Sequence, residues 1–367
     1  MASRLRVFSP QSASFTSPLS FRFPVQRSGI SFLSRLSVMN MSTSHATQSK
    51  GALKVGTNLV GQTGILYCID QVLQHRTEPH LSCVYMATTQ DGKKHVIKDI
   101  YSTEFEYQWG LQAPLAGCPN LRVAKDTVPE HLLFIYDFLT EDLFGLARRD
   151  SLSCTARKRI LRDSLTGLAA LHERGILHGD IKPNNIFVDC DLVDGTIKVE
   201  RAQIGDLEMG SMIPPGLNVR GARLGNPMWR SPESHAAARI NTPSDVFSFG
   251  LVCIYTMLHK NIFYIEERDV GVYEKDRIIA KRLLSHFGDG PGLVGFLQHL
   301  EDDSAEWRDI VVAVADGFTP EDPRKPLSMW EDVDEPFRDI VAKMTSLDPA
   351  RRITAKDALE HPWFNHI

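Results

Sequence analysis

The feature that most constrains this 367-residue chain is the eight-residue string His178–Asn185, which reads His-Gly-Asp-Ile-Lys-Pro-Asn-Asn. Before the string, residues 156–173 repeat apolar side chains at the spacing of an amphipathic helix. After it, residues 186–188 read Ile-Phe-Val, as a buried strand does. The string is therefore expected to form a polar loop between a helix and a strand.

Three side chains of this loop suit the transfer of a phosphoryl group. Such a transfer needs a carboxylate that accepts the proton of the nucleophile, oxygen ligands for magnesium and a cation near the moving charge. Asp180 is the carboxylate, Lys182 is the cation and the amide of Asn185 is a metal ligand by type. A lone His-x-Asp is common, whereas the whole string is specific.

Other motifs stand in a fixed order around the loop. Asp206 lies 21 residues after Asn185, behind a strand-like run, and suits a magnesium ligand. Lys98 ends the strand-like run Val-Ile-Lys, where its amine could pair with the α- and β-phosphates of a nucleotide. The later motifs are Ser231–Glu233, Asp245–Gly250, Arg351–Ala355 and His361–Phe364.

Apolar patterning divides the chain into a β-rich part and a helical part. The pattern is helical from about residue 142 onward and includes a core helix over 247–258. The earlier part predicts a helix over 103–115 and strands at 65–73, 81–100, 121–124 and 132–138. We expect a hinge between the two parts near residues 137–142.

The ordered motifs resemble those of a serine/threonine protein kinase over roughly residues 65–365. The resemblance implies an α+β, bilobal protein-kinase-like fold with a small, mostly-β N-lobe and a larger, mostly-α C-lobe. It implies ATP and Mg²⁺ as cofactors, a protein substrate with a Ser or Thr acceptor as partner, and transfer of the γ-phosphoryl group to that hydroxyl.

The resemblance also assigns roles to the polar residues. Asp180 would be the catalytic base and Lys182 the phosphate-side lysine of the serine/threonine class. Asn185 and Asp206 would hold magnesium, and Lys98 would be the ATP lysine.

The segment 134–139 is similar to the adenine-binding hinge of that family, with Tyr136 as gatekeeper. The backbone groups of Asp137 and Leu139 would face adenine, and Asp142 would approach the ribose. In the C-lobe, the resemblance implies structural roles, in which Glu233 pairs with Arg352 and Asp245 supports the catalytic loop.

The nucleotide-binding motifs depart from the family pattern at two places. The three expected glycines of the phosphate-covering loop are replaced at about Thr77, Pro79 and Ser82, which predicts a stiffer, more open lid and a weaker grip on nucleotide. The helix glutamate that should pair with Lys98 is ambiguous between Glu104 and Glu106, and Glu106 is favoured by its position.

The segment that follows the catalytic loop departs at two further places. Asp206-Leu207-Glu208 lacks the usual final glycine, so switching of the backbone there is expected to be restricted. Gly179 replaces the arginine that holds a phosphate on the activation segment. Activity independent of phosphorylation of that segment is therefore expected, and residues 206–233 contain two serines and no threonine.

Two other functions compete with an active kinase. A pseudokinase that serves as a scaffold and binds nucleotide weakly or not at all would fit the missing glycines, but would have no chemical reason to keep Lys98, Asp180, Asn185 and Asp206. A small-molecule phosphotransferase would fit the His-Gly-Asp loop, but those enzymes generally lack the motifs at 231–233 and 245–250.

Residues 1–50 differ in composition from the rest. They contain five arginines, one lysine, many serines and no acidic residue, which is the composition of an organellar transit peptide. The serines favour the chloroplast over the mitochondrion. Initiation at Met39 or Met41 would leave a cytosolic form, and a tail without an address is the alternative. We predict three parts, namely a transit-peptide-like extension at 1–50, an N-lobe at 51–140 and a C-lobe at 141–367.

Charge and cysteine content exclude some partners. The whole chain carries −4 and residues 1–50 carry +6, so the remainder carries −10, which argues against nucleic-acid binding. The six cysteines show no paired spacing and are expected to be separate reduced thiols. The longest apolar run is too short for an integral membrane segment, and the sequence does not reveal the oligomeric state.

Overall fold

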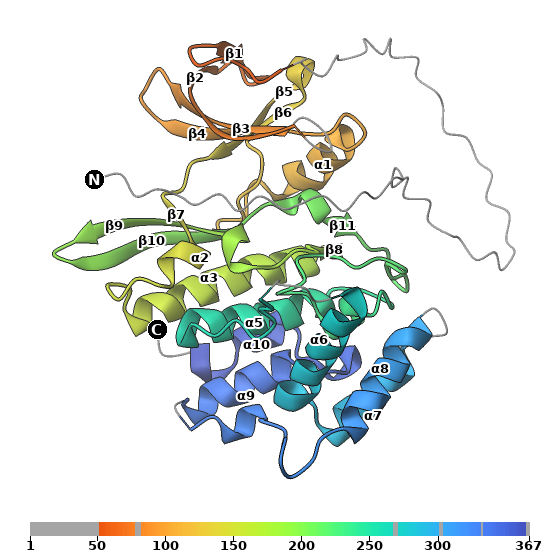
Figure 1. Ribbon diagram of the computed structural model, residues 1–367. Helices are drawn as coiled ribbons and strands as arrows, with labels where there is room; N and C mark the ends of the chain where they lie inside the picture. The colour runs from red at the N-terminus through yellow and green to blue at the C-terminus, as the bar shows by residue number, and fades with distance from the viewer. Residues whose placement is uncertain (1–50, 78–81, 267–270, 301–303, 332, 365–367) are drawn as a thin grey trace, which may run out of the picture. The chain divides into compact units, whose positions relative to one another are not determined.

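A six-stranded antiparallel sheet forms the first part of the fold (Figure 1). The computed structural model describes residues 51–77, 82–266, 271–300, 304–331 and 333–364. The order of the strands is β1-β2-β3-β4-β6-β5, and the helix α1 lies between β4 and β5 in the chain. These elements are β1 (Asn58–Val60), β2 (Leu66–Arg76), β3 (Ser82–Thr89), β4 (Lys94–Asp99), α1 (Phe105–Gln112), β5 (Asp126–Val128) and β6 (Leu133–Asp137).

The alternation of side chains along the strands explains the two faces of this sheet. On β4, His95 and Ile97 are buried, and the residues between and beside them are less so. On the face toward α1, Phe105 packs against Phe134 with ring centroids 4.9 Å apart. The antiparallel register of β4 and β6 pairs Lys98 with Phe134, which fixes the position of the lysine relative to the hinge.

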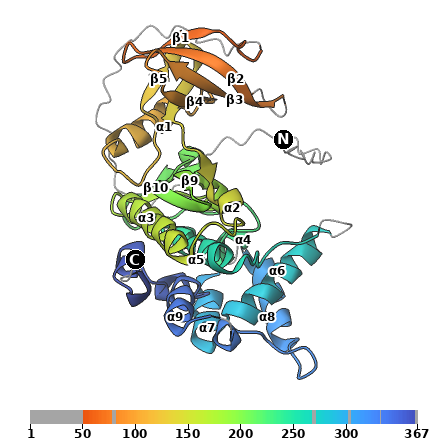
Figure 2. The same ribbon diagram turned by 90° about the vertical axis from the view of Figure 1, so that its left-hand side faces the viewer.

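Helices make up most of the second part, below the β9–β10 hairpin in Figures 1 and 2. Its short sheets join β7 (Glu141–Asp142), β9 (Ile186–Val193) and β10 (Thr196–Ile204), and β8 (Ile176–Leu177) with β11 (Ser211–Met212). Its helices are α2 (Leu143–Leu146), α3 (Cys154–His172), α4 (Pro232–His235), α5 (Pro243–Leu258), α6 (Val272–Phe287), α7 (Gly290–His299), α8 (Ala305–Asp316), α9 (Glu335–Met344) and α10 (Ala355–Leu359).

Two helices form the centre of this second part. Helix α3 begins at Ser153, whose hydroxyl accepts a hydrogen bond from the backbone N–H of Ala156, and it buries its apolar face. Helix α5 is buried from Ser244 to Thr256, as expected for a helix that is apolar all round. Together with α9 they contribute to the largest hydrophobic core of the described residues, which also takes side chains from α6, α8, β9 and β10.

The predicted fold class is confirmed, since a β-rich part precedes a larger helical part. The helix predicted over 103–115 is shorter, because Pro114 has no N–H to continue α1 and the chain forms a 3₁₀ turn over Ala113–Leu115. The strand predicted at 121–124 is wrong. There Leu121 makes only an isolated bridge to Ile204, and the edge strand lies at β5 instead.

The boundaries predicted for the three parts of the chain stay predictions, and residues 1–50 lie outside the described part. All six cysteines are described, and each is a free thiol, as predicted. In the described residues, no helix combines the length and the apolar character needed to cross a membrane.

Candidate active site

The loop between β8 and β9 is held from below by a buried carboxylate of α5. Asp245 accepts hydrogen bonds from the backbone N–H groups of His178, at 2.8 Å, and Gly179, at 2.9 Å. The imidazole of His178 lies 3.1 Å from the carbonyl oxygen of Gly205 and so joins this loop to the end of β10. The predicted supporting role of Asp245 is confirmed.

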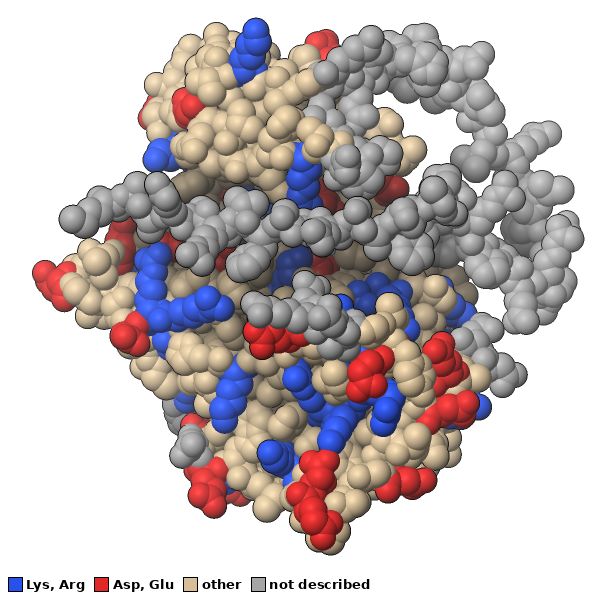
Figure 3. Space-filling view, in the orientation of Figure 1, with Lys and Arg blue, Asp and Glu red and all other residues tan. Residues whose placement is uncertain are grey.

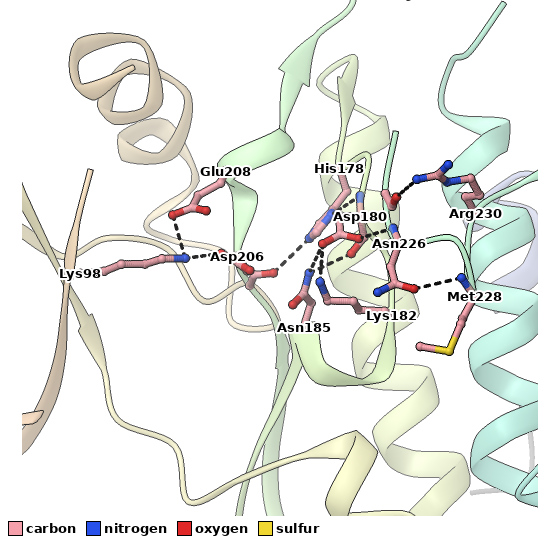
Figure 4. Close-up of polar contacts among 12 residues, drawn as sticks. Lys98, His178, Asp180, Lys182, Asn185, Asp206, Glu208, Asn226, Met228 and Arg230 are labelled. Atoms are coloured by element: carbon pink, nitrogen blue, oxygen red, sulfur yellow. Dashed lines mark hydrogen bonds and ion pairs between the residues drawn. The ribbon is translucent and has the colours of Figure 1, made fainter. Parts of the chain in front are cut away.

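Both carboxylate oxygens of Asp180 have fixed partners (Figure 4). The ammonium group of Lys182 lies 2.5 Å from Oδ2, and the amide of Asn185 donates to the same oxygen at 3.2 Å. The backbone N–H of Asn226 donates to Oδ1 at 3.0 Å. Because the Asp180 side chain is only 12% exposed, these contacts define its orientation.

Two glycines let the chain around Asn226 approach the catalytic loop. Gly179 has φ +77° and Gly225 has φ +78°, a region that favours glycine. A Cβ on Gly225 would lie 2.8 Å from the carbonyl oxygen of Gly179. The glycine at 225 therefore permits this close backbone contact, while a Cβ on Gly179, which departs from the family pattern, would lie 3.2 Å from the carbonyl oxygen of Met209.

Lys98 is paired with two carboxylates that belong to the same short segment. Its Nζ lies 2.7 Å from Asp206 and 2.8 Å from Glu208. Burial acts to lower the pKa of Lys98, but the two carboxylates outweigh it and raise that pKa above its usual value. Burial acts to raise the pKa of Asp206, and the Lys98 ammonium holds it below its usual value.

The expectation that Glu106 pairs with Lys98 is therefore wrong for this structure. Glu106 lies on an exposed position of α1, whereas the polar residues that the helix turns inward are Gln108 and Gln112, each 2% exposed. The amide of Gln108 donates to the backbone oxygen of Glu208 at 3.0 Å. Helix α1 therefore does not supply the carboxylate that pairs with Lys98. It holds in place the segment that does, through the contact of Gln108 with Glu208.

The two expected metal ligands lie on neighbouring strand ends. The backbone N–H of Gly205, next to Asp206, donates to the carbonyl oxygen of Asn185 at 2.9 Å. The NH₂ of Asn185 points to Asp180, which leaves its amide oxygen as the atom for a metal (Figure 4). In the described ranges no group of three or more His, Cys, Asp or Glu could hold a metal. One carboxylate and one amide fit Mg²⁺ that is also bound by phosphates.

The hinge residues are buried at the meeting of the two parts. Leu139 is 7% exposed and Asp137 is 5% exposed. The Asp137 carboxylate pairs with Lys93, Lys125 and Arg201. Burial acts to raise its pKa, but these cations hold it below the usual value.

Asp142, expected near the ribose, lies at the N-terminus of α2. Its side chain accepts a hydrogen bond from the backbone N–H of Gly145 at 2.9 Å and lies 3.5 Å from the amide of Asn184. Of the expected glycine-loop positions, Thr77 follows β2 and Ser82 begins β3, and Pro79 lies outside the described residues.

Four polar residues at the site were missed from the sequence, namely Gln108, Arg122, Glu208 and Asn226. From the sequence, Glu208 was interpreted only as the replacement of the usual glycine. An acidic residue two positions after Asp206 could have indicated a second partner for Lys98. Asn226 acts through its backbone, which no side-chain pattern reveals. Arg122 stands in the segment wrongly predicted as a strand, where its guanidinium donates to the carbonyl oxygen of Asp137 at 2.9 Å.

Comparison with known proteins agrees with this geometry. Residues 81–364 match the protein kinase domain family. The chain belongs to this family. A crystal structure of a kinase domain superimposes with a TM-score of 0.62 at 15% identity, over 86% of this chain and 98% of that chain. The yeast RNA Pol II CTD kinase CTDK-1 complex gives a TM-score of 0.61 at 17% identity, over 77% and 90%. These likenesses concern the fold.

Curated relatives of this kinase-family chain are distant. A probable cyclin-dependent kinase 8 of Dictyostelium discoideum is 26% identical over 64% of this chain. The serine/threonine-protein kinase pkn2 of Myxococcus xanthus is 28% identical over 34% of this chain. The leaf rust 10 disease-resistance locus receptor-like protein kinase-like 1.3 of Arabidopsis thaliana is 27% identical over 46%. The aligned regions span 61%, 15% and 26% of the three relatives' own lengths.

Proposed function

We propose that this chain is an active serine/threonine protein kinase that transfers the γ-phosphoryl group of ATP to protein hydroxyls. The observation that carries the proposal is the fixed orientation of Asp180, whose two oxygens are held by Lys182, Asn185 and Asn226. A positioned carboxylate can orient an acceptor hydroxyl and take its proton, and positioning supplies much of the acceleration of such a transfer.

The remaining polar residues divide the work of binding phosphates. Lys98 is proposed to contact the α- and β-phosphates. The carboxylate of Glu208, 2.8 Å from the Lys98 ammonium group, would keep the lysine extended toward the site. Asn185 and Asp206 are proposed to hold Mg²⁺, which neutralises charge on the phosphate oxygens when it is bound. Lys182, next to Asp180, is proposed to balance charge on the transferred group.

The contacts of the activation segment are the argument for activity without phosphorylation of that segment. Its contact with the catalytic loop runs through the Asn226 N–H and the glycines at 179 and 225, none of which needs a phosphate. Ser231 is fully buried at the start of α4, where its hydroxyl lies 2.7 Å from that of Ser244. We therefore propose that phosphatase-treated protein and a Ser211→Ala variant keep the activity of the untreated chain.

A chloroplast address for residues 1–50 is a separate proposal that rests on their composition. A fusion of the full chain to a fluorescent protein tests it. Fluorescence in chloroplasts is expected, and mitochondrial or cytosolic fluorescence would contradict it.

A pseudokinase is the second candidate, favoured by the pairing of Lys98 with two carboxylates and by the missing glycines. The full chain, an Asp180→Asn variant and a control, Asp322→Asn, are assayed with labelled ATP and Mg²⁺ on a mixture of protein substrates. Asp322 is an exposed acid that also pairs with a lysine, Lys281, but on the surface of the helical part.

Loss of a general base is expected to reduce the rate by about 100-fold or more. The kinase proposal therefore requires transfer by the wild type and the control and a large loss in Asp180→Asn. If the wild type transfers no phosphate but is stabilised against heat by ATP, the chain is a nucleotide-binding pseudokinase. Equal rates for all three proteins would show that Asp180 is not the base.

A further inference from the structure

A buried arginine donates a hydrogen bond to a hinge carbonyl that is expected to face adenine. Arg122 is 8% exposed, although it follows a turn and precedes the edge strand β5. Its backbone N–H donates to the carbonyl oxygen of Ile204 at 2.7 Å, so the residue is anchored to the end of β10. From there its side chain extends to Asp137, the last residue of β6, where the hinge begins.

Three contacts define the position of the guanidinium. Its Nε donates to the carbonyl oxygen of Asp137 at 2.9 Å. Its central carbon lies 4.4 Å from the ring centre of Phe187 and 5.1 Å from that of Tyr136. Phe187 comes from β9 and Tyr136 from β6, so the guanidinium lies against aromatic rings of both parts of the fold.

These are the same contacts that a purine base would need. A bound base presents a flat ring system to apolar or aromatic side chains and hydrogen-bonds a backbone edge. A guanidinium is also planar, stacks on aromatic rings and donates hydrogen bonds. Because the carbonyl of Asp137 already accepts from Arg122, a base that uses this carbonyl must compete with the arginine.

The surroundings hold the arginine closely. A Cβ on Gly205 would lie 3.0 Å from the Cβ of Arg122 and 3.1 Å from the Phe187 ring, so the three residues are in tight contact. Burial lowers the pKa of Arg122 to about 10, against the opposing effects of Tyr136, Asp206 and Asp137. The guanidinium therefore stays charged at neutral pH.

We propose that Arg122 is a plug in the base-binding end of the nucleotide site, and that the base of ATP binds only after this side chain has left the hinge. The inference rests on the proposed function only in placing the base at Asp137. The plug would weaken nucleotide binding, because only molecules whose Arg122 has left the hinge can bind the base. The observed dissociation constant is the intrinsic one divided by the fraction of such open molecules.

Two variants at position 122 test the plug in the full-length chain. Arg122→Val opens the space and removes the donor, whereas Arg122→Met removes the donor and keeps most of the volume. Arg159→Met is the matched control, because the Arg159 guanidinium also donates to a backbone carbonyl, that of Val199 in β10 at 2.8 Å, and Val199 is not a hinge residue. Thermal unfolding checks that each variant is folded.

The ligands separate the base from the phosphates. Adenosine carries the base without phosphates, inorganic tripolyphosphate carries phosphates without the base, and ADP carries both. Calorimetry with each ligand is expected to show tighter binding of adenosine and ADP to Arg122→Val, by about tenfold or more, since a hydrogen bond from a charged donor no longer competes. Arg122→Met should gain less, and tripolyphosphate should gain nothing.

The plug is excluded if adenosine binds both variants no more tightly than it binds the wild type, or if tripolyphosphate gains as much as adenosine does. It is also excluded if Arg159→Met gives the same increase. These results are independent of catalysis. Tighter adenosine binding without phosphate transfer would support the plug and contradict the kinase proposal, and active transfer with unchanged adenosine affinity would do the reverse.

Discussion

The ammonium group of Lys98 lies 2.8 Å from the carboxylate of Glu208, a residue of the segment after β10 and not of helix α1. Glu208 thus takes the position relative to Lys98 that a helix glutamate was expected to fill. Gln108 fastens this arrangement, because its amide donates to the Glu208 backbone oxygen. The orientation of Lys98 therefore depends on the segment that begins with Asp206.

Replacement of Glu208 is the first prediction. Glu208→Gln should lower kcat/KM for ATP by about tenfold, because Lys98 loses one of two charges that hold it extended, a contact worth about 1–2 kcal/mol at a half-exposed site. Steady-state kinetics with varied ATP measure the effect. Glu106→Gln is the control and should change kcat/KM by less than twofold, since Glu106 is exposed.

A reversed result would restore the expectation from the sequence. If Glu106→Gln impairs ATP use and Glu208→Gln does not, then α1 must rotate when nucleotide binds and bring Glu106 to Lys98. A Glu208→Gly variant distinguishes the effect of the lost charge from the effect of a more flexible backbone. It should behave like Glu208→Gln if the carboxylate matters, and worse if the segment also loosens.

A second prediction concerns the buried ion pair of the helical part. Arg352 Nη1 and Nη2 lie 2.5 Å and 2.7 Å from the two carboxylate oxygens of Glu233, and both side chains are at most 1% exposed. Glu233→Gln should lower the free energy of unfolding by about 3–5 kcal/mol, because it leaves a buried guanidinium without its counter-charge. Urea titration measures the loss.

An exposed pair provides the contrast. Lys281 pairs with Asp322, and their side chains are 51% and 56% exposed. Lys281→Gln should cost less than about 1 kcal/mol, because water screens such a pair. Similar losses for Glu233→Gln and Lys281→Gln would show that burial does not set the value of the Glu233–Arg352 pair.

A third prediction addresses Gly179. Its φ of +77° strains any residue with a Cβ, and a Cβ there would lie 3.2 Å from the carbonyl oxygen of Met209. Gly179→Ala should destabilise the chain by about 1–2 kcal/mol. Gly179→Arg, which restores the residue usual in the family, should lose activity and not gain a dependence on phosphorylation. An active, phosphorylation-dependent Gly179→Arg variant would contradict this structural explanation.

The sequence predicted the parts of this site that depend on chain order. The loop that contains Asp180 carries its partners Lys182 and Asn185 within five residues, so local spacing was enough to place them together. The support of the loop by Asp245 and the Glu233–Arg352 pair followed from the family pattern and are confirmed by their contacts. The order of a β-rich part before a helical part followed from apolar periodicity.

The parts that could not be predicted depend on packing between distant elements. Pro114 ends α1 early, and the contact between Gln108 of α1 and the backbone of Glu208 joins elements about 100 residues apart in the chain. The position of Arg122 depends on a bridge between residues 121 and 204, which no local pattern reveals. The burial of Arg122 could not be predicted either, because it depends on the aromatic rings of Phe187 and Tyr136, which belong to two other strands.

The fourth prediction is a loss of stability in mild acid through His235. This side chain is fully buried, stacks on Trp307 with ring centroids 5.7 Å apart and has a ring Nε2 without a hydrogen-bond partner among the described residues. Burial, and then the charges of Arg230 and Arg223, lower its pKa well below the usual value. The folded protein therefore keeps His235 neutral where the unfolded chain binds a proton.

Because the folded pKa is depressed, the contribution of His235 to stability is present above the unfolded pKa of about 6.5 and is lost as the pH falls below it. The loss approaches about 1.4 kcal/mol per pH unit. Urea titrations between pH 7.5 and pH 5.5 should give a smaller decrease for His235→Phe, which keeps an aromatic ring against Trp307, than for the wild type. His75→Phe, at an exposed position, should follow the wild type. Other histidines with a depressed pKa act equally in all three proteins, so equal slopes for His235→Phe and wild type would mean that folding does not depress the pKa of His235.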